Sequence, residues 1–277
     1  MKIKSILFLM ATNLLFLTSC SQVGYFEGYN HKVTGEEFRE CVEKFANVNC
    51  RNEEDKLNDF ALTMYQYSEE STTTLFKDGV RSKESNITEV SLEGQYDLSN
   101  SIYHVRTTAN ASKETNSSTE KITVKEDYTY QNVDKAFYCF DNIYKTYEKY
   151  SNSMLCSDFV SDDFVDFQYE TIYLMELGGQ SAMGSIESVT CYKDNNVYTY
   201  EIKVSSEEDN EIINKKAIVQ AMFTNKRCFL YSETLKETIT EADSKKVTSK
   251  SYYYNKIEYN FKNISIKPVN MDKYNLD

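Results

Sequence analysis

Residues that could carry out acid–base or nucleophilic catalysis are few in this chain. Only two histidines occur, His31 near the N-terminus and His104 in a segment that reads as a strand. The sequence contains no Gly-x-Ser-x-Gly motif, no Gly-rich phosphate-binding loop, and no His-Glu-x-x-His or Cys-x-x-Cys metal motif. A lone strand histidine is more often structural than catalytic, so we expect no enzyme activity and no catalytic residue. Because the metal and phosphate-binding motifs are missing, we also expect no metal and no cofactor.

An acidic group is the remaining candidate for ion binding. It consists of Asp158, Asp162, Asp163 and Asp166. Carboxylate oxygens suit Ca²⁺, but the group lacks the alternating Asp/Asn residues and the Gly of a dedicated calcium loop. We interpret it as a helix start, where negative charge complements the helix dipole, followed by a solvated helix face.

The N-terminus has the profile of an export signal. Lys2 and Lys4 precede an apolar run from Ile6 to Leu17. As a helix this run would rise roughly 18 Å, which is too short for a hydrocarbon core of roughly 30 Å. It is therefore expected to be a signal and not a permanent span.

The residues that end this run are Leu17-Thr18-Ser19-Cys20. They resemble the lipobox of bacterial lipoproteins, in which a diacylglycerol is attached to the cysteine sulfur and a peptidase cuts before that residue. The resemblance implies cleavage between Ser19 and Cys20 and a lipid anchor on Cys20. Two acyl chains suffice for stable membrane attachment. We expect a signal peptide over 1–19, a lipidated cysteine and flexible tether over 20–32, and a single domain over 33–277, anchored to the cell membrane and facing outside the cytoplasm.

Composition limits the partners and the class of the anchored domain. The formal net charge is −12, which disfavours nucleic acid as a partner because nucleic-acid binders cluster Lys and Arg. Hydrophobic residues make up 40% of the chain, and the sequence has 23 Tyr and 15 Phe, so a substantial core can form.

An exported protein can form disulfides. Apart from Cys20 there are six cysteines: Cys41, Cys50, Cys139, Cys156, Cys191 and Cys228. Six cysteines allow fifteen complete pairings, and sequence does not choose among them. Cys41 with Cys50 and Cys191 with Cys228 are the pairs we favour, the second because both lie on neighbouring predicted strands. Buried free thiols remain the alternative.

Two helices are predicted. The first covers about 35–48, because Thr34 and Glu37 form a capping box and apolar residues follow at helical spacing. The second covers 162–177, starting after Ser161 and ending at Gly178-Gly179.

Most other segments alternate between apolar and polar residues, as half-buried strands do. Two hairpins are expected, at 186–204 and at 216–233, and further strands at 60–67, 89–96, 102–108, 122–130 and 247–266. The last segment changes its apolar parity, which predicts a β-bulge near Asn263. The segment 136–147 fits either a helix or a strand, and its Tyr and Phe content favours a strand.

This order of elements predicts an α+β fold, with a large curved antiparallel sheet packed on a few helices. It resembles the half-barrel of LolA-like carriers and related lipid-binding lipoproteins, in element order and in the lipoprotein signal. The resemblance implies a cavity for acyl chains or another hydrophobic ligand. The aromatic residues that would line it are Phe164, Phe167, Tyr198 and Tyr200, which are equally well explained as packed core.

Two non-catalytic functions follow as hypotheses. The first is a lipoprotein that binds a hydrophobic ligand such as a lipid, which needs a cavity of several hundred Å³. The alternative is a structural or protein-interaction lipoprotein of the cell envelope, with protein partners that the sequence does not identify, which needs an exposed interaction surface.

Overall fold

The computed structural model describes residues 31–51, 57–133, 136–150, 156–183, 189–208, 210–242 and 245–276. Its elements in chain order are β1 (Lys32–Val33), α2 (Gly35–Ala46), β2 (Phe60–Phe76), β3 (Arg81–Asp97), β4 (Ile102–Thr115), β5 (Thr119–Val133), β6 (Ala136–Asp141), β7 (Thr146–Tyr150), α3 (Cys156–Met183), β8 (Val189–Asp194), β9 (Val197–Glu208), β10 (Glu211–Phe223), β11 (Arg227–Ala242), β12 (Lys245–Phe261), the 3-10 turn η1 (Met271–Lys273) and β13 (Asn275–Leu276).

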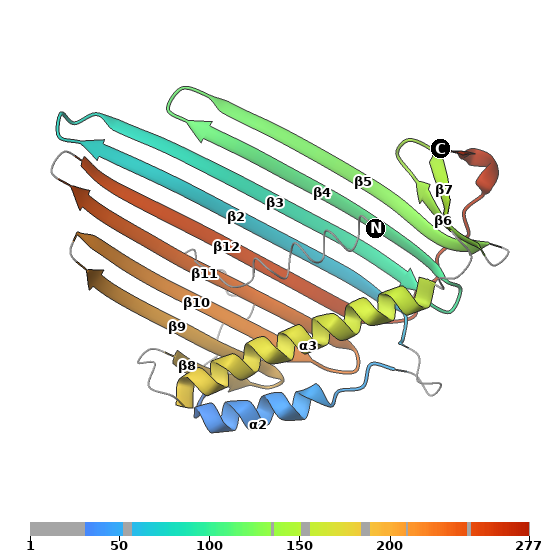
Figure 1. Ribbon diagram of the computed structural model, residues 1–277. Helices are drawn as coiled ribbons and strands as arrows, with labels where there is room; N and C mark the ends of the chain where they lie inside the picture. The colour runs from blue at the N-terminus through green and yellow to red at the C-terminus, as the bar shows by residue number, and fades with distance from the viewer. Residues whose placement is uncertain are drawn as a thin grey trace.

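All strands belong to one open sheet, in the order β1-β8-β9-β10-β11-β12-β2-β3-β4-β5-β6-β7-β13. Neighbouring strands are antiparallel except β13, which runs parallel to β7. The sheet consists of two meanders, β2 to β7 and β8 to β12, which join where β12 pairs with β2 from Lys245↔Phe76 to Phe261↔Phe60. Helix α3 connects the two meanders by crossing one end of the long strands (Figure 1).

The expected α+β class is wrong, because the described chain is mainly β. Two helices accompany a 13-stranded sheet within the described residues. Apolar alternation marks only the half-buried part of each strand, so the pattern underestimates the extent of the sheet. The strand predicted at 60–67, for example, continues as β2 to Phe76 through a polar Ser, Thr and Glu sequence.

Helix α2 begins where the capping box predicts. Thr34 N–H donates to Glu37 Oε2 over 2.8 Å, and Glu37 N–H donates to Thr34 Oγ1 over 3.2 Å. The hydrogen bond from the Thr34 N–H holds the pKa of the Glu37 carboxyl below its usual value. Immediately before this helix, Lys32 and Val33 pair with β8 as the short strand β1.

Helix α3 does not end at Gly178-Gly179 but continues to Met183. Gly178 lies against the ring of Tyr200 on β9, so closely that a Cβ at this position would be 2.3 Å from Tyr200 Cδ1. The glycine is therefore needed for close packing of helix on sheet and does not terminate the helix.

The hydrophobic core lies between the two helices and the adjacent ends of the long strands. Its buried members include Phe38 and Val42 of α2, Met175 of α3, and Phe60 and Leu230 of the sheet. On the other side of the sheet, Val197, Phe229 and Tyr231 form a second, smaller cluster.

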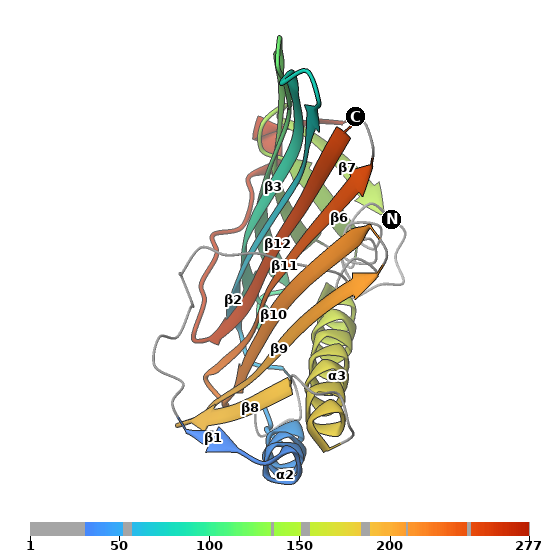
Figure 2. The same ribbon diagram turned by 90° about the vertical axis from the view of Figure 1, so that its left-hand side faces the viewer.

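The far halves of the long strands extend beyond the helices. Figure 2 shows the sheet close to edge-on, with α2 and α3 at one end and the β2–β3 hairpin at the other. A 17-residue strand such as β12 is about 55 Å long, so it continues well past the core. Cross-strand ion pairs join this part, including Lys113 with Glu84 at 2.7 Å and Lys250 with Glu237 at 2.8 Å.

The C-terminal segment leaves the sheet at Phe261, so the predicted continuation to 266 with a bulge near Asn263 is wrong. Residues 262–270 instead run across the ends of the first meander. The N–H groups of Ile266 and Val269 donate to the side chains of Asp97 and Gln131. The alternation of apolar residues shifts after Phe261 because residues 262–270 are not part of a strand.

Gly178→Ala is expected to lower the free energy of unfolding by about 1–3 kcal/mol, because the new methyl group must displace the Tyr200 ring. Gly179→Ala is the matched control, since its Cβ would approach its nearest neighbour, Phe38 Cδ1, only to 3.3 Å. Both variants gain helix propensity. Urea unfolding followed by circular dichroism measures the difference, and equal stabilities of the two variants would contradict the packing role of Gly178.

Candidate functional site

The aromatic residues expected to line a cavity are buried in the core: Phe164, Phe167, Tyr198 and Tyr200. The ring of Tyr259 lies 5.0 Å from that of Phe164 and 4.7 Å from that of Phe167, measured between centroids. The Tyr200 ring meets Phe38 of α2 edge to face at 6.3 Å. These contacts are those of packed core residues.

Neither of the favoured cysteine pairs is brought together by the fold. Cys191 Sγ lies 3.9 Å from the carbonyl oxygen of Gly178, and Cys41 is half-buried. Cys50 instead lies beside Cys228, with 3.7 Å between their sulfurs. Ser19 and Cys20, the predicted cleavage and lipidation residues, are outside the described residues.

His104 takes part in a polar network on the sheet face opposite the helices. Its Nε2 lies 2.8 Å from Asp127 Oδ1, while Arg106 Nε donates to Asp127 Oδ2 over 2.9 Å. Asn142 Nδ2 donates to the same carboxylate over 2.6 Å, and Tyr274 OH donates to Asn142 Oδ1 over 2.6 Å. Partial burial would raise the pKa of Asp127, but the hydrogen bonds from Asn142, His104 and Arg106 outweigh it and lower that pKa. The network joins β4, β5, the β6–β7 turn and the C-terminal segment.

A second carboxylate network lies between β11 and β12. Arg227 Nε donates to Glu258 Oε1 over 2.9 Å, Asn260 Nδ2 donates to the same oxygen over 2.7 Å, and Lys256 Nζ lies 3.4 Å from Oε2. Burial alone would raise the pKa of Glu258, but these partners outweigh it and lower the pKa to about 2. Glu258 is therefore ionised in the folded protein at all ordinary pH values.

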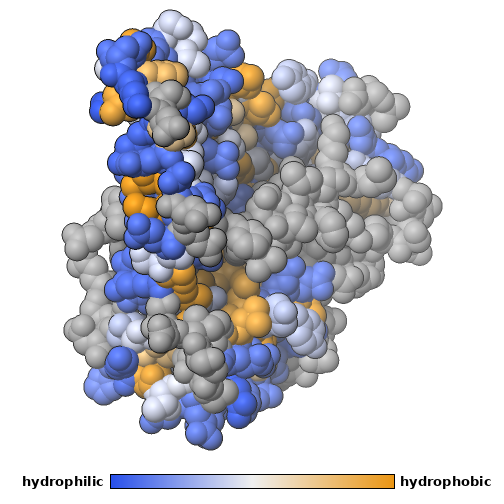
Figure 3. Space-filling model, turned by 60° about the vertical axis from the view of Figure 1, so that its left-hand side comes forward, coloured by the Kyte–Doolittle hydropathy of each residue, from blue (hydrophilic) through white to orange (hydrophobic). Residues whose placement is uncertain are grey.

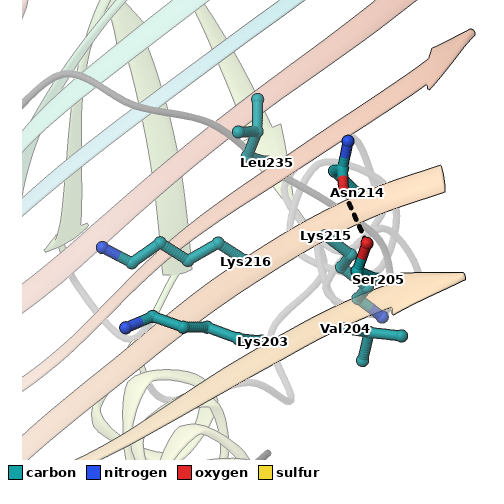
Figure 4. A pocket seen from close by; sticks show the side chains of 7 residues that line it. All are labelled: Lys203, Val204, Ser205, Asn214, Lys215, Lys216 and Leu235. Carbon is teal, nitrogen blue, oxygen red and sulfur yellow. Dashed lines mark hydrogen bonds between the residues drawn. The ribbon is translucent and has the colours of Figure 1, made fainter. Parts of the chain in front are cut away.

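A depression of about 410 Å³ lies over β9, β10 and β11. Figure 4 shows Lys203 and Lys216 lying side by side there, and Asn214 joined to Ser205 by a 2.8 Å hydrogen bond. The Nζ atoms of Lys203 and Lys216 lie 3.2 and 3.4 Å from Glu201 Oε1, which offsets part of their charge. The depression is open to solvent, so it does not provide the enclosed cavity that an acyl chain requires.

The outer edge of β5 is the candidate interaction site. Strand β6 pairs with β5 only from Tyr128 to Val133, so the segment 119–127 has β4 on one side and no paired strand of the described residues on the other. Every residue from 119 to 125 is exposed. In the view of Figure 3, hydrophilic residues dominate the described surface and hydrophobic ones form separate patches.

The backbone of this segment has hydrogen-bonding groups directed outward. Asp127 O accepts a hydrogen bond from Asn142 N–H on the outer side of β5, while Ser118 O accepts one from Thr115 on the β4 side. Because successive peptide units alternate between the two sides of a strand, the N–H and C=O groups of Lys121, Thr123 and Lys125 also point outward. They form a row to which another strand can add.

The side chains of this edge separate into two faces. Ile122 and Val124 are 66% and 51% exposed. They lie on the same face of the sheet as the hydrophobic core, which is located at the other end of the strands. They pair with the small residues Ala111 and Ala109 of β4. Lys121 and Lys125 lie on the opposite face. We name the segment 119–127 the β5 edge.

Sequence reasoning missed the β5 edge although it predicted a strand at 122–130. The alternation of Ile122 and Val124 with Lys and Thr indicates a strand whose apolar face is covered. In the fold, α3 covers the other end of the sheet, and this face of the strand is exposed. The pairing of β6 with one end of β5 alone leaves the edge open, and no local signal in the sequence reveals this.

Within the described ranges, no helix has the length and apolarity to cross a membrane. The same residues contain no cluster of three or more His, Cys, Asp or Glu side chains arranged to hold a metal ion.

The pKa of Glu258 leads to a pH-dependent stability. A carboxyl whose pKa is lower in the folded than in the unfolded chain stabilises the fold above about pH 4.5, and this contribution is lost as the pH falls toward 2. Relative to wild type, Glu258→Gln is expected to be about 2 kcal/mol less stable at pH 6 and nearly equal at pH 2. Denaturant unfolding at both pH values measures this. Glu241→Gln, which removes an exposed pair with Lys246, should show little pH-dependent difference, and equal behaviour of the two variants would refute the role of Glu258.

Neither the family models nor the curated proteins compared with this chain match it. Among solved structures, the translocator domain of the autotransporter NalP from Neisseria meningitidis is 9% identical, with coverage of 82% of this chain and 94% of that chain and a TM-score of 0.18. The S-type phycobiliprotein lyase CPES from Guillardia theta is 6% identical over 80% and 92% of the two chains, with a TM-score of 0.14. A FadL homologue from Pseudomonas aeruginosa is 6% identical over 74% and 90%, with a TM-score of 0.13. Likenesses at these TM-scores carry no argument about fold or function.

Proposed function

We propose that this protein is a bacterial lipoprotein, held outside the cytoplasm by a lipid on Cys20, that binds another protein through the exposed half of its sheet. The open and exposed β5 edge is the observation that carries this proposal. The edge takes up an extended segment of the partner, which adds to the sheet as a further strand.

The position of the anchor favours this use of the sheet. The described chain begins at His31 and enters β1 and α2, at the end of the molecule opposite the β2–β3 hairpin (Figure 2). A lipid on Cys20, eleven residues before His31, attaches the chain on the side of the sequence that leads into the α2 end. An anchor of this kind leaves the far parts of the long hairpins, including the start of β5, free of covalent attachment to the membrane.

The chemistry of the β5 edge specifies the partner segment. Main-chain hydrogen bonds supply affinity without regard to sequence, and the side chains supply the specificity. Ile122 and Val124 favour apolar residues on one face, while Lys121 and Lys125 favour acidic residues on the other. A segment that alternates acidic and apolar residues fits both faces.

A second copy of this chain fits the edge less well. Antiparallel pairing of two β5 edges centred on Thr123 would set Lys121 of one copy opposite Lys125 of the other. Like charges directly opposite each other destabilise a strand pair. The lysines thus disfavour this self-association and leave the edge available to an acidic partner.

Binding of a hydrophobic ligand is the less supported proposal. It requires an enclosed apolar cavity, whereas the four aromatic residues proposed for its wall pack against other rings. The depression over β9 to β11 is open to solvent and does not enclose a ligand.

The anchor is tested by Cys20→Ala, which removes the sulfur that carries the lipid. Most of the protein is expected to move from the membrane fraction to the soluble fraction, because the apolar signal run is too short for a permanent span. Immunoblotting of fractionated cells measures the ratio, with Cys41→Ala as the control that stays at the membrane. Unchanged membrane association of Cys20→Ala would overturn the proposed anchor.

The interaction is tested by crosslinking on intact cells. A photoreactive amino acid at position 122 is expected to give a discrete adduct with a partner, and the same group at exposed position 169 on α3 is not. Lys121→Pro should abolish the adduct, because proline removes an outward N–H while leaving the hydrogen bonds to β4 in place. Circular dichroism checks that the variant is folded. If position 122 gives no adduct, or Lys121→Pro leaves its yield unchanged, the β5 edge is not the binding site.

A further inference from the structure

The sulfurs of Cys50 and Cys228 are in direct contact in the core of the protein. Their sulfurs lie 3.7 Å apart although 178 positions separate the residues in the chain. Both sulfurs also lie close to the carbonyl oxygen of Thr224, at 3.7 and 3.6 Å. Cys50 follows α2, and Cys228 is the second residue of β11, so the contact joins the segment after the helix to the sheet.

Local structure holds each residue of this pair in place. The N–H and Nδ2 groups of Asn58 donate to Cys50 O over 3.2 and 2.8 Å. Thr224 N–H donates to Arg227 O over 2.8 Å, which closes the turn before Cys228. Cys50 is 3% exposed and Cys228 is fully buried, so water and small thiols have little access to the pair once the chain has folded.

We propose that Cys50 and Cys228 form a disulfide in the exported protein. The inference rests on the proposed export, since disulfides persist in oxidising compartments. A disulfide requires about 2.05 Å between the sulfurs, so they must approach by roughly 1.7 Å, and the bond replaces only weak S–H hydrogen bonds.

The bond forms by thiol–disulfide exchange during folding. The oxidant is itself a disulfide, either of an oxidoreductase or of a small molecule such as oxidised glutathione. The Cys50 thiolate attacks one oxidant sulfur, and the other sulfur leaves as a thiolate. Cys228 then loses its proton and attacks Cys50 Sγ, which releases the second oxidant sulfur. Two electrons and two protons pass from the cysteines to the oxidant.

In the folded pair, a hydrogen bond from Cys228 lowers the pKa of Cys50, whereas the contact with Cys50 and burial raise the pKa of Cys228. Cys50 is therefore the more readily ionised thiol of the folded pair.

Intact mass and peptide mapping test the proposal on the lipidated protein isolated from cell membranes without reductant. Alkylation after denaturation should modify two fewer thiols than in the reduced sample, and mapping should find the Cys50 peptide joined to the Cys228 peptide. Reduction should lower the melting temperature by about 10 °C, because a link across a long loop restricts the unfolded chain.

Two variants make the test specific. Cys50→Ser should remove both the link and the effect of reductant on the melting temperature, whereas the control Cys139→Ser should retain both. Alkylation of every thiol, or a map showing Cys41–Cys50 or Cys191–Cys228 links, would overturn the inference. The body lacking residues 1–20, refolded with oxidised glutathione, tests the same pair without export, so a failure of the proposed anchor is distinguished from a failure of the disulfide.

Discussion

Pairing of β12 with β2 is the constraint on which the rest of the structure depends. It joins residues that are about 170 to 200 positions apart and holds the two meanders in a single sheet. The core is built around this junction, where Phe60 and Tyr259 lie next to each other with 5.2 Å between their ring centroids. Helix α3 packs on the same place through Phe164, so one layer of aromatic side chains fixes both the strand register and the position of the helix. The loss of entropy in forming such distant contacts is offset by burying several large rings together.

The sequence predicted the parts of the fold that local physics determines. The capping box at Thr34 and the hairpin turn before Val197 were confirmed, because each depends on neighbouring residues. The strand favoured for 136–147 is found as β6, a turn at 142–145 and the start of β7. The end of α3 was predicted wrongly, since Gly178 has its role in a contact with Tyr200, a residue that becomes its neighbour only in the folded chain. The α+β class failed for a related reason: the far part of strands such as β2 consists mainly of Ser, Thr and Glu, so it lacks the apolar alternation that identifies strands in a sequence.

The candidate site shows the same limit. The sequence predicts a strand at the β5 edge but not that this strand is exposed. The alternation of apolar and polar residues is the same whether a helix or water covers the apolar face. The four aromatic residues proposed to line a cavity lie in packed core, which is the alternative that the sequence left open for them. The contact between Cys50 and Cys228 was beyond prediction, since it depends on how the segment after α2 meets the start of β11. Only the proposed lipid attachment at Cys20 rests on a continuous sequence motif.

The C-terminal segment occupies a particular place in this architecture. It leaves the middle of the sheet at Phe261, crosses the ends of the first meander and finishes beside β7 as β13. During folding, one side of β2 therefore lacks its partner strand until residues 245–261 pair with it, and β7 gains its outer neighbour only when the last residues of the chain form β13. The first meander alone cannot form the finished sheet, so residues from both ends of the chain must be present before the sheet is complete.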